Sequence, residues 1–353
     1  MNWIKSAFVI VLLSVVLFLV CDAILGALNI HLITTAADLE KSEGKIRVEH
    51  STFHHNLAPN VTTKNAYWGH YYELCTDGHG FKSPCSQRSI DQKHYDIAFV
   101  GDSFTEGVGL PYENTFVGMF AKNNPKLKIA NLGVVGTSPT IYFNKVKYYV
   151  EHGLRFDHVI AFVDISDVRN EALLYFEENG IVVGRFGEPN RLKLALRDMF
   201  PHSYVLLKSI KDHVASPAVW DDPDGEWTYR PNSPNYGPKG VSYGVKKSMK
   251  KMTELYEYLK DHNIKLSVGV YPWMNQLKYD KATNLHQKQW QQFCRNRCEM
   301  FIDANKRFFD YLARFDFEKT AADLYIPGDI HFSTAGNELI YQALQEAYDA
   351  RQQ

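Results

Sequence analysis

Hydrophobic residues in this chain gather in short runs that are separated by longer amphipathic stretches. Five of the runs suit buried strands, and they occupy residues 97–100, 127–132, 158–163, 266–271 and 300–303. Continuous apolar runs of this length are typical of strands covered on both faces of a parallel sheet. The pattern therefore predicts a central, mostly parallel sheet of five strands.

Helical periodicity appears between these runs, most clearly in residues 245–260 and after Ser333. In the first segment the apolar positions are Val245, Met249, Met252, Tyr256 and Leu259. The lysines between them fall on the opposite face, so we interpret that basic run as a solvated helix surface and not as a nucleic-acid site. Strands that alternate with helices predict a doubly wound α/β/α fold of three layers, with ligands bound beyond the carboxyl ends of the strands.

The N-terminus has a different pattern. Residues 7–21 are apolar except for Ser14, and the apolar stretch resumes after Asp22. About 20 apolar residues can cross a bilayer, whereas a cleaved signal peptide has a shorter apolar core and a small-residue cleavage site. We predict an uncleaved single-pass anchor within residues 1–37, in the inner (plasma) membrane, with the rest of the chain on the extracytoplasmic side. A cleaved signal and a buried helix of a soluble domain are the alternatives.

The rest of the chain divides into three parts. Residues 38–95 form a loop-rich lead-in, and residues 96–353 form the α/β domain. An insertion at about 186–244 interrupts that domain and is longer than a crossover needs. It contains several aromatic residues, among them Trp220 and Trp227. These rings either pack the insertion against itself or form a substrate-binding platform, and both interpretations remain open.

Composition narrows the classes of partner. A net charge of −1 over 353 residues offers no electrostatic basis for binding nucleic acid. The aromatic fraction of 14% suits core packing and also a surface that stacks on sugars. His50, His54 and His55 lie close together but lack an accompanying acidic ligand pattern, so we predict no metal site there and no cofactor.

Cysteine spacing indicates an exported body. Apart from Cys21 in the predicted span, the chain has Cys75 and Cys85 in one region and Cys294 and Cys298 in another. Four cysteines allow three pairings, and we favour the two local ones because each closes a short loop. A zinc site is the alternative, although neither pair has the two-residue spacing common in such sites.

Candidate catalytic residues lie in two short motifs, one after the first predicted strand and one before the last predicted helix. Gly101-Asp102-Ser103-Phe104 comes directly after the first strand, and Asp329-Ile330-His331 comes before the final helical segment. A serine hydroxyl becomes nucleophilic when an imidazole accepts its proton and a carboxylate orients that imidazole. We therefore predict Ser103 as nucleophile, His331 as base and Asp329 as the orienting acid.

These residues resemble motifs of the SGNH/GDSL hydrolase superfamily, over residues 96–350. The resemblance implies a flavodoxin-like fold, an acyl-serine intermediate and an oxyanion hole built partly from a glycine after the second strand. In the stretch Asn131-Leu132-Gly133-Val134-Val135-Gly136-Thr137, Gly136 is the matching donor and Gly133 the second choice.

Two departures from the family pattern affect the site. The third family motif usually reads Gly-x-Asn-Asp, but the aligned stretch here is Asp164-Ile165-Ser166-Asp167. Ser166 therefore stands at the position of the asparagine oxyanion donor. Either Ser166 fills that role, or Asn170 does, or the hole has only two backbone donors. The family's Asp-x-x-His is also shortened, because Asp329 stands two residues before His331.

The shorter spacing is similar to membrane-linked branches of the superfamily, including acetyltransferases that act on exopolysaccharides. The resemblance implies a serine acyl-ester hydrolase or O-acyltransferase whose substrate is an acylated carbohydrate or another small ester. O-acetyl groups on envelope or extracellular glycans are the expected target. The altered third motif motivates the alternative, a catalytically degenerate module that binds a glycan or a protein.

Overall fold

The computed structural model describes residues 2–28, 46–68, 70–86, 92–184, 199–200, 202–203 and 222–352. The chain divides into two compact units. One consists of Met1–Lys45 and Phe186–Pro217, and the other of Ile46–Arg185 and Ala218–Gln353. The second unit contains the described strands and the predicted catalytic residues.

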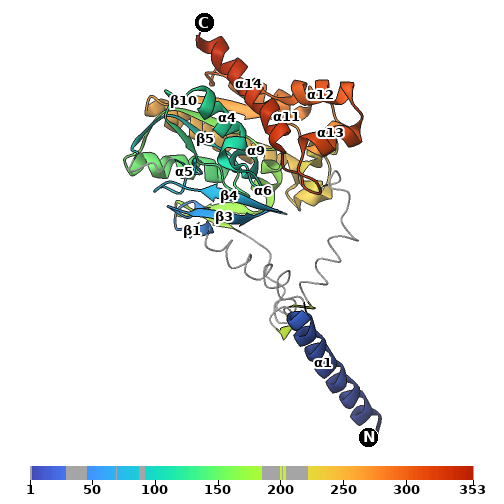
Figure 1. Cartoon of the computed structure of the whole chain (residues 1–353). Helices are drawn as coiled ribbons and strands as arrows, with labels where there is room; N and C mark the ends of the chain where they lie inside the picture. The colour runs from blue at the N-terminus through green and yellow to red at the C-terminus, as the bar shows by residue number, and fades with distance from the viewer. Residues whose placement is uncertain are drawn as a thin grey trace. The chain divides into compact units, whose positions relative to one another are not determined.

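A five-stranded parallel sheet forms the centre of the second unit (Figure 1). Its strands, in chain order, are β5 (His94–Val100), β6 (Ile129–Asn131), β7 (Arg155–Phe162), β10 (Lys265–Val270) and β11 (Phe301–Asp303). Each overlaps one of the predicted apolar runs. The spatial order β11-β10-β7-β5-β6 is the flavodoxin-like arrangement, so the predicted sheet is confirmed. The strand order reverses between β5 and β7, where folds of this kind bind ligands.

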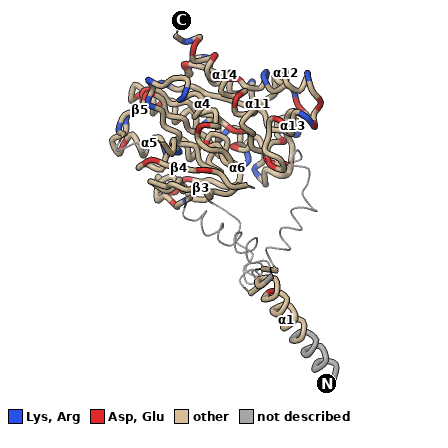
Figure 2. The backbone as a smooth tube through the Cα atoms, viewed as in Figure 1, with Lys and Arg blue, Asp and Glu red and all other residues tan. Residues whose placement is uncertain are grey.

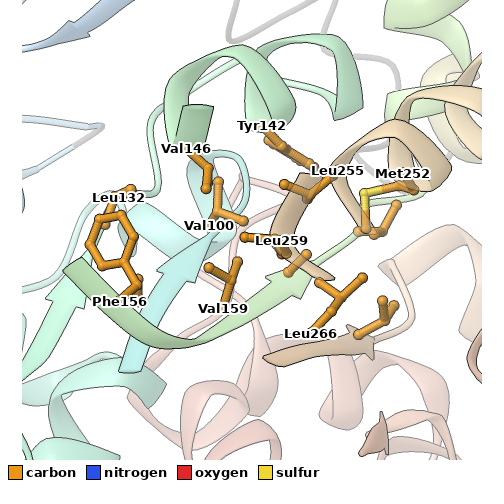
Figure 3. Packing of buried hydrophobic residues seen from close by; sticks show 14 of the residues in the cluster. Val100, Leu132, Tyr142, Val146, Phe156, Val159, Met252, Leu255, Leu259 and Leu266 are labelled. Atoms are coloured by element: carbon orange, nitrogen blue, oxygen red, sulfur yellow. The ribbon is translucent and has the colours of Figure 1, made fainter. Parts of the chain in front are cut away.

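Helices cover both faces of this sheet. Ala98 and Val100 of β5 contact one apolar cluster, part of which Figure 3 shows. Ile97 and Phe99 contact the other cluster, because successive side chains of a strand point to opposite faces. The first face carries α5 (Pro139–Glu151), α9 (Gly240–Asp261) and α11 (Leu285–Cys294), and the second carries α4 (Phe116–Asn123), α12 (Asn305–Arg314) and α14 (Thr334–Gln352).

Antiparallel hairpins flank the sheet, and two of them lie in the predicted lead-in. These two are β1 (Arg47–His50) with β2 (His54–Leu57), and β3 (Thr62–Tyr67) with β4 (Tyr71–Cys75). The third is β8 (Tyr175–Glu178) with β9 (Ile181–Gly184). Short helices include α3 (Ser103–Glu106), α6 (Asp167–Leu173), α10 (Met274–Tyr279), α13 (Phe317–Leu324), η1 (Tyr112–Asn114), η3 (Pro223–Thr228) and η4 (Pro234–Tyr236).

Helix α1 (Asn2–Leu28) contains the apolar N-terminal stretch. Among the residues that the structure describes, no helix is both long and apolar enough to cross a bilayer. The transmembrane helix predicted within residues 1–37 is therefore not supported.

Both predicted local disulfides are present. Cys75 pairs with Cys85 at a Cα–Cα distance of 5.2 Å, and Cys294 pairs with Cys298 at 4.6 Å. Both distances lie in the usual range for disulfides. Because these sulfurs are covalently paired, they cannot serve as thiolate ligands of the alternative zinc site.

His286 on α11 supplies a test of the packing. It is buried, and neither ring nitrogen has a hydrogen-bond partner in the described part of the chain. Burial lowers the pKa of His286 to about 3, so the unfolded chain binds a proton below about pH 6.5 that the folded chain does not. The free energy of unfolding is therefore highest, as far as His286 is concerned, above pH 6.5, and it decreases as the pH falls towards 3.

We expect His286→Phe to remove this pH dependence. The difference in unfolding free energy between wild type and variant should change by about 1.4 kcal/mol per pH unit between roughly pH 6 and 4. Urea denaturation across that range measures the difference. Parallel pH profiles for the two proteins would show that His286 is not a buried neutral imidazole.

Candidate active site

The candidate nucleophile stands directly beyond the carboxyl end of β5. Helix α3 begins at Ser103, and Asp102 caps it by accepting the N–H of Phe104 at 3.0 Å. The turn is tight at Gly101, where an added Cβ would lie 2.9 Å from the carbonyl oxygen of Phe162 and 2.1 Å from Thr105 Oγ1. A side chain at position 101 would therefore push the serine turn away from the strand end.

Ser103, His331 and Asp329 form one hydrogen-bonded chain. His331 Nε2 lies 2.7 Å from Ser103 Oγ, and His331 Nδ1 lies 2.5 Å from Asp329 Oδ1. Ser103 and His331 are only 7% and 6% exposed. In this arrangement the imidazole can take the serine proton while the carboxylate fixes its tautomer and stabilises its positive charge. The structure thus brings together all three residues predicted for catalysis.

Asp329 is held in its ionised form. Its Oδ1 also accepts the backbone N–H of His331 at 2.9 Å, and its Oδ2 accepts the indole N–H of Trp68 at 2.8 Å. Burial alone would raise the pKa of Asp329, but these hydrogen bonds and the charge of His331 hold it below its ordinary value. The shortened Asp-x-His spacing therefore still delivers a carboxylate to the correct ring nitrogen.

Trp68 is a site residue that the sequence analysis missed. It follows β3, and its ring meets the His331 ring edge-on with centroids 5.1 Å apart. Trp68 and Asp329 are 261 positions apart in the chain. No periodicity or local motif connects such distant residues, so this contact becomes visible only in the folded chain.

Glu106 connects the serine helix to two other segments. It is fully buried, its Oε1 pairs with Arg47 of β1 at 2.7 Å, and its Oε2 accepts the N–H of Val135 at 2.9 Å. Lys82 and Lys145 are buried close by, and burial lowers the pKa of each to about 7 although the charge of Glu106 opposes that shift. Glu106 therefore anchors the loop after β6, which contains the predicted oxyanion glycines.

Gly136 is the better placed of those two glycines. Its φ of 72° is in the left-handed region that favours glycine. Within the described residues, the backbone N–H groups of Gly136 and Ser103 have no hydrogen-bond partner, so both are available to a developing oxyanion. The N–H of Gly133 is already engaged, since it donates to Asn131 Oδ1 at 2.9 Å.

Ser166 lies at the start of α6 and is engaged with Asp164. Its backbone N–H donates to Asp164 Oδ1 at 2.7 Å. Burial raises the pKa of Asp164, and hydrogen bonds from the hydroxyl and N–H of Ser166 oppose that effect. The Ser166 hydroxyl would have to leave Asp164 to donate to an oxyanion. Asn170, the alternative donor, is also buried on α6.

Three buried carboxyl groups follow the ends of β5 and β7, namely Asp102, Asp164 and Asp167. Burial raises the pKa of each, and the charge of Asp164 adds to the effect on the other two. Tyr271 donates to Asp102 at 3.3 Å and Tyr142 donates to Asp167 at 3.1 Å. The two tyrosines thus provide hydrogen-bond donors for buried acids near the serine. The imidazole of His331 bonds to Asp329 and not to these acids.

Two tryptophans of the aromatic insertion are predicted to bind substrate, and the structure describes one of them. Trp220 lies outside the described residues. Trp227 is only 3% exposed, and its indole N–H donates to the carbonyl of Ile165 at 2.9 Å. A ring buried in this way presents no face for stacking on a sugar, because it packs in the apolar core instead. The substrate-binding role predicted for Trp227 therefore does not fit its position.

No protein-family model matches the chain. No curated protein matches it either. Among solved structures, it is similar to a lipolytic G-D-S-L family protein from Veillonella parvula, with 12% identity, a TM-score of 0.40 and coverage of 72% of this chain and 98% of that one. It is also similar to a catalytic mutant of an acetylxylan esterase from Geobacillus stearothermophilus, with 13% identity, a TM-score of 0.42 and coverage of 72% of this chain and 93% of that one. For the psychrotrophic esterase EstA from Pseudoalteromonas sp., the identity is 12% and the TM-score 0.38, with coverage of 73% of this chain and 97% of that one. These identities and scores are too low to transfer an activity.

The third oxyanion donor can be tested by substitution. We expect Ser166→Ala to lower kcat for a small ester by about 100-fold while KM stays nearly constant, because the donor acts mainly in the transition state. Ser166→Asn should preserve or raise kcat by supplying an amide of longer reach. Steady-state kinetics of both variants beside Asn170→Ala measure this. A wild-type kcat in Ser166→Ala together with a reduced kcat in Asn170→Ala would assign the donor to Asn170.

Proposed function

We propose that this protein is an SGNH-type serine ester hydrolase or O-acyltransferase. The observation that carries the proposal is the hydrogen-bonded chain from Ser103 through His331 to Asp329 at the ligand-binding edge of the sheet. The order of strands and the motif positions agree with it, because β5 ends at the point where the strand order reverses.

The proposed reaction has two half-reactions. Ser103 Oγ attacks the ester carbonyl while His331 Nε2 accepts the hydroxyl proton, and the resulting oxyanion is bound by the N–H groups of Ser103 and Gly136. His331 then gives the proton to the departing alcohol, which leaves an acyl-serine. Water or an acceptor hydroxyl attacks this ester in the same way and releases Ser103. Every step is a proton transfer or an acyl transfer that this chain's own groups can perform.

The proposed substrate is an O-acetylated glycan outside the cytoplasm. The two disulfides support an oxidising compartment, where such bonds persist. Acidic and basic residues are interspersed along the described chain (Figure 2), which suits a neutral carbohydrate better than a polyanion. The motif resemblance supplies the acetyl group as the expected acyl unit.

A second candidate is a binding module without turnover. The position of Ser166 favours it, because its hydroxyl is engaged with Asp164 and not directed freely towards an oxyanion. In that case the triad geometry would remain, but the tetrahedral intermediate would be poorly stabilised.

Labelling with a fluorophosphonate tests whether Ser103 is an activated nucleophile, because the probe bonds covalently to an activated serine. We expect the wild-type protein to be labelled and Ser103→Ala to be unlabelled. Ser51→Ala, a change at an exposed serine, should be labelled like wild type. Intact mass spectrometry measures the adduct, and circular dichroism confirms that Ser103→Ala is folded. Equal labelling of wild type and Ser103→Ala would refute the proposed nucleophile.

The fate of the acyl-enzyme is a separate question. Water is present at about 55 M, so transfer requires an acceptor held at high effective molarity. Trp227, the one of the two predicted tryptophans that the structure describes, is buried and offers no platform for an acceptor. We therefore expect hydrolysis, with free acetate matching the alcohol released from an aryl acetate mole for mole. Quantification of both products, with and without an acceptor oligosaccharide, measures this. A deficit of acetate and the appearance of acetylated sugar would establish transfer instead.

A further inference from the structure

We propose that Trp68 is a positioning residue of the triad, and that the N-terminal β3–β4 hairpin is thereby part of the active site. This inference rests on the proposed function, which it deepens. The indole N–H of Trp68 donates to Asp329 Oδ2 at 2.8 Å, whereas Oδ1 of the same carboxylate receives His331 Nδ1. The two oxygens of Asp329 are thus assigned to different donors.

The indole suits this role because it is a donor only. A carboxylate with one free oxygen can rotate about its terminal bond and turn its plane away from the histidine. With Oδ2 engaged by Trp68, that rotation costs a charge-assisted hydrogen bond, so the carboxylate stays aligned with His331. The same bond favours the ionised carboxylate and contributes to the lowered pKa of Asp329.

Trp68 is itself held by contacts to the rest of the site. Its ring meets the His331 ring edge-on, and the Arg47 guanidinium lies 5.9 Å from its centroid. Arg47 in turn pairs with Glu106, which ends the serine helix. The backbone N–H of Trp68 donates to the carbonyl of His70. A ring nitrogen of His70 in turn lies 2.7 Å from the carbonyl oxygen of Gly109. The β3–β4 hairpin therefore contacts the loop after the serine helix α3 and the turn that contains Asp329 and His331.

The test compares Trp68→Phe with Tyr67→Phe. Trp68→Phe keeps an aromatic ring against His331 but removes the N–H, whereas Tyr67→Phe is an equally conservative change at the neighbouring position of the same hairpin. We expect Trp68→Phe to lower kcat roughly 10-fold with KM within about twofold, because the substitution affects the carboxylate that orients the catalytic base and not the binding of substrate. Tyr67→Phe should retain wild-type kinetics.

The pH profile separates positioning from structural damage. Without the indole donor, the carboxylate is a stronger base and binds the imidazole proton more tightly, so the acidic limb of kcat/KM should move to higher pH. Titration with the fluorophosphonate gives the fraction of active protein. Unchanged kcat and an unmoved limb would overturn the inference, as would a loss of rate explained entirely by a smaller active fraction.

A readout without turnover keeps the inference testable if the proposed activity fails. The His331 Nδ1 proton, hydrogen-bonded to Asp329, should give a downfield proton NMR resonance that is absent in His331→Ala. We expect Trp68→Phe to shift this resonance and Tyr67→Phe to leave it in place. A shift in a protein that hydrolyses no ester would retain the role of Trp68 and refute the function, whereas no shift would refute the role of Trp68.

Discussion

The position of β5 between β6 and β7 determines where the candidate site lies. Both faces of β5 are buried, and its parallel neighbours fix its register, so its carboxyl end cannot move independently of the sheet. The strand order reverses there, which leaves room beyond the strand end for a ligand. Ser103 follows after the tight turn at Gly101. The nucleophile is therefore attached to one of the most constrained points of the fold.

Buried charges connect this point to the N-terminal hairpins. Glu106 ends the serine helix and pairs with Arg47, while Lys82 donates to the carbonyls of Gly107 and Leu110. Removing one partner of such a group would leave an uncompensated buried charge, which is strongly destabilising. The hairpins and the loop that contains Gly136 are consequently held in one arrangement with the serine helix. The lead-in behaves as a structural part of the site and not as a spacer.

The departures from the SGNH pattern have different consequences. The shortened spacing between Asp329 and His331 is harmless, because the turn still brings carboxylate and imidazole into contact. The replacement of the usual asparagine by Ser166 has a larger effect. Its short hydroxyl bonds to Asp164 within the same turn, whereas an amide could reach further. The proposed oxyanion hole is thus the least complete part of the candidate site.

Information that is local in the chain was available from the sequence alone. Apolar runs identified the five strands because burial on both faces requires continuous hydrophobicity, and short cysteine spacings identified the disulfides because small loops close easily. The motifs around Ser103 and His331 predicted the residues of the triad because such chemistry needs those groups at the ends of elements.

Tertiary structure decided what depends on long-range contact. The hairpins of residues 46–75 have short, partly polar strands that give little periodic signal. The residues that they contact outside the hairpins, such as Glu106 and Asp329, lie far along the chain. The contact of Trp68 with Asp329 spans 261 positions, and the buried indole of Trp227 donates to the carbonyl of Ile165 in the β7–α6 connection. A sequence pattern reports which face of an element is apolar, but not which distant element covers it. The fold class and the triad were therefore determined locally, whereas the support of the triad by the N-terminal hairpins was decided only by packing.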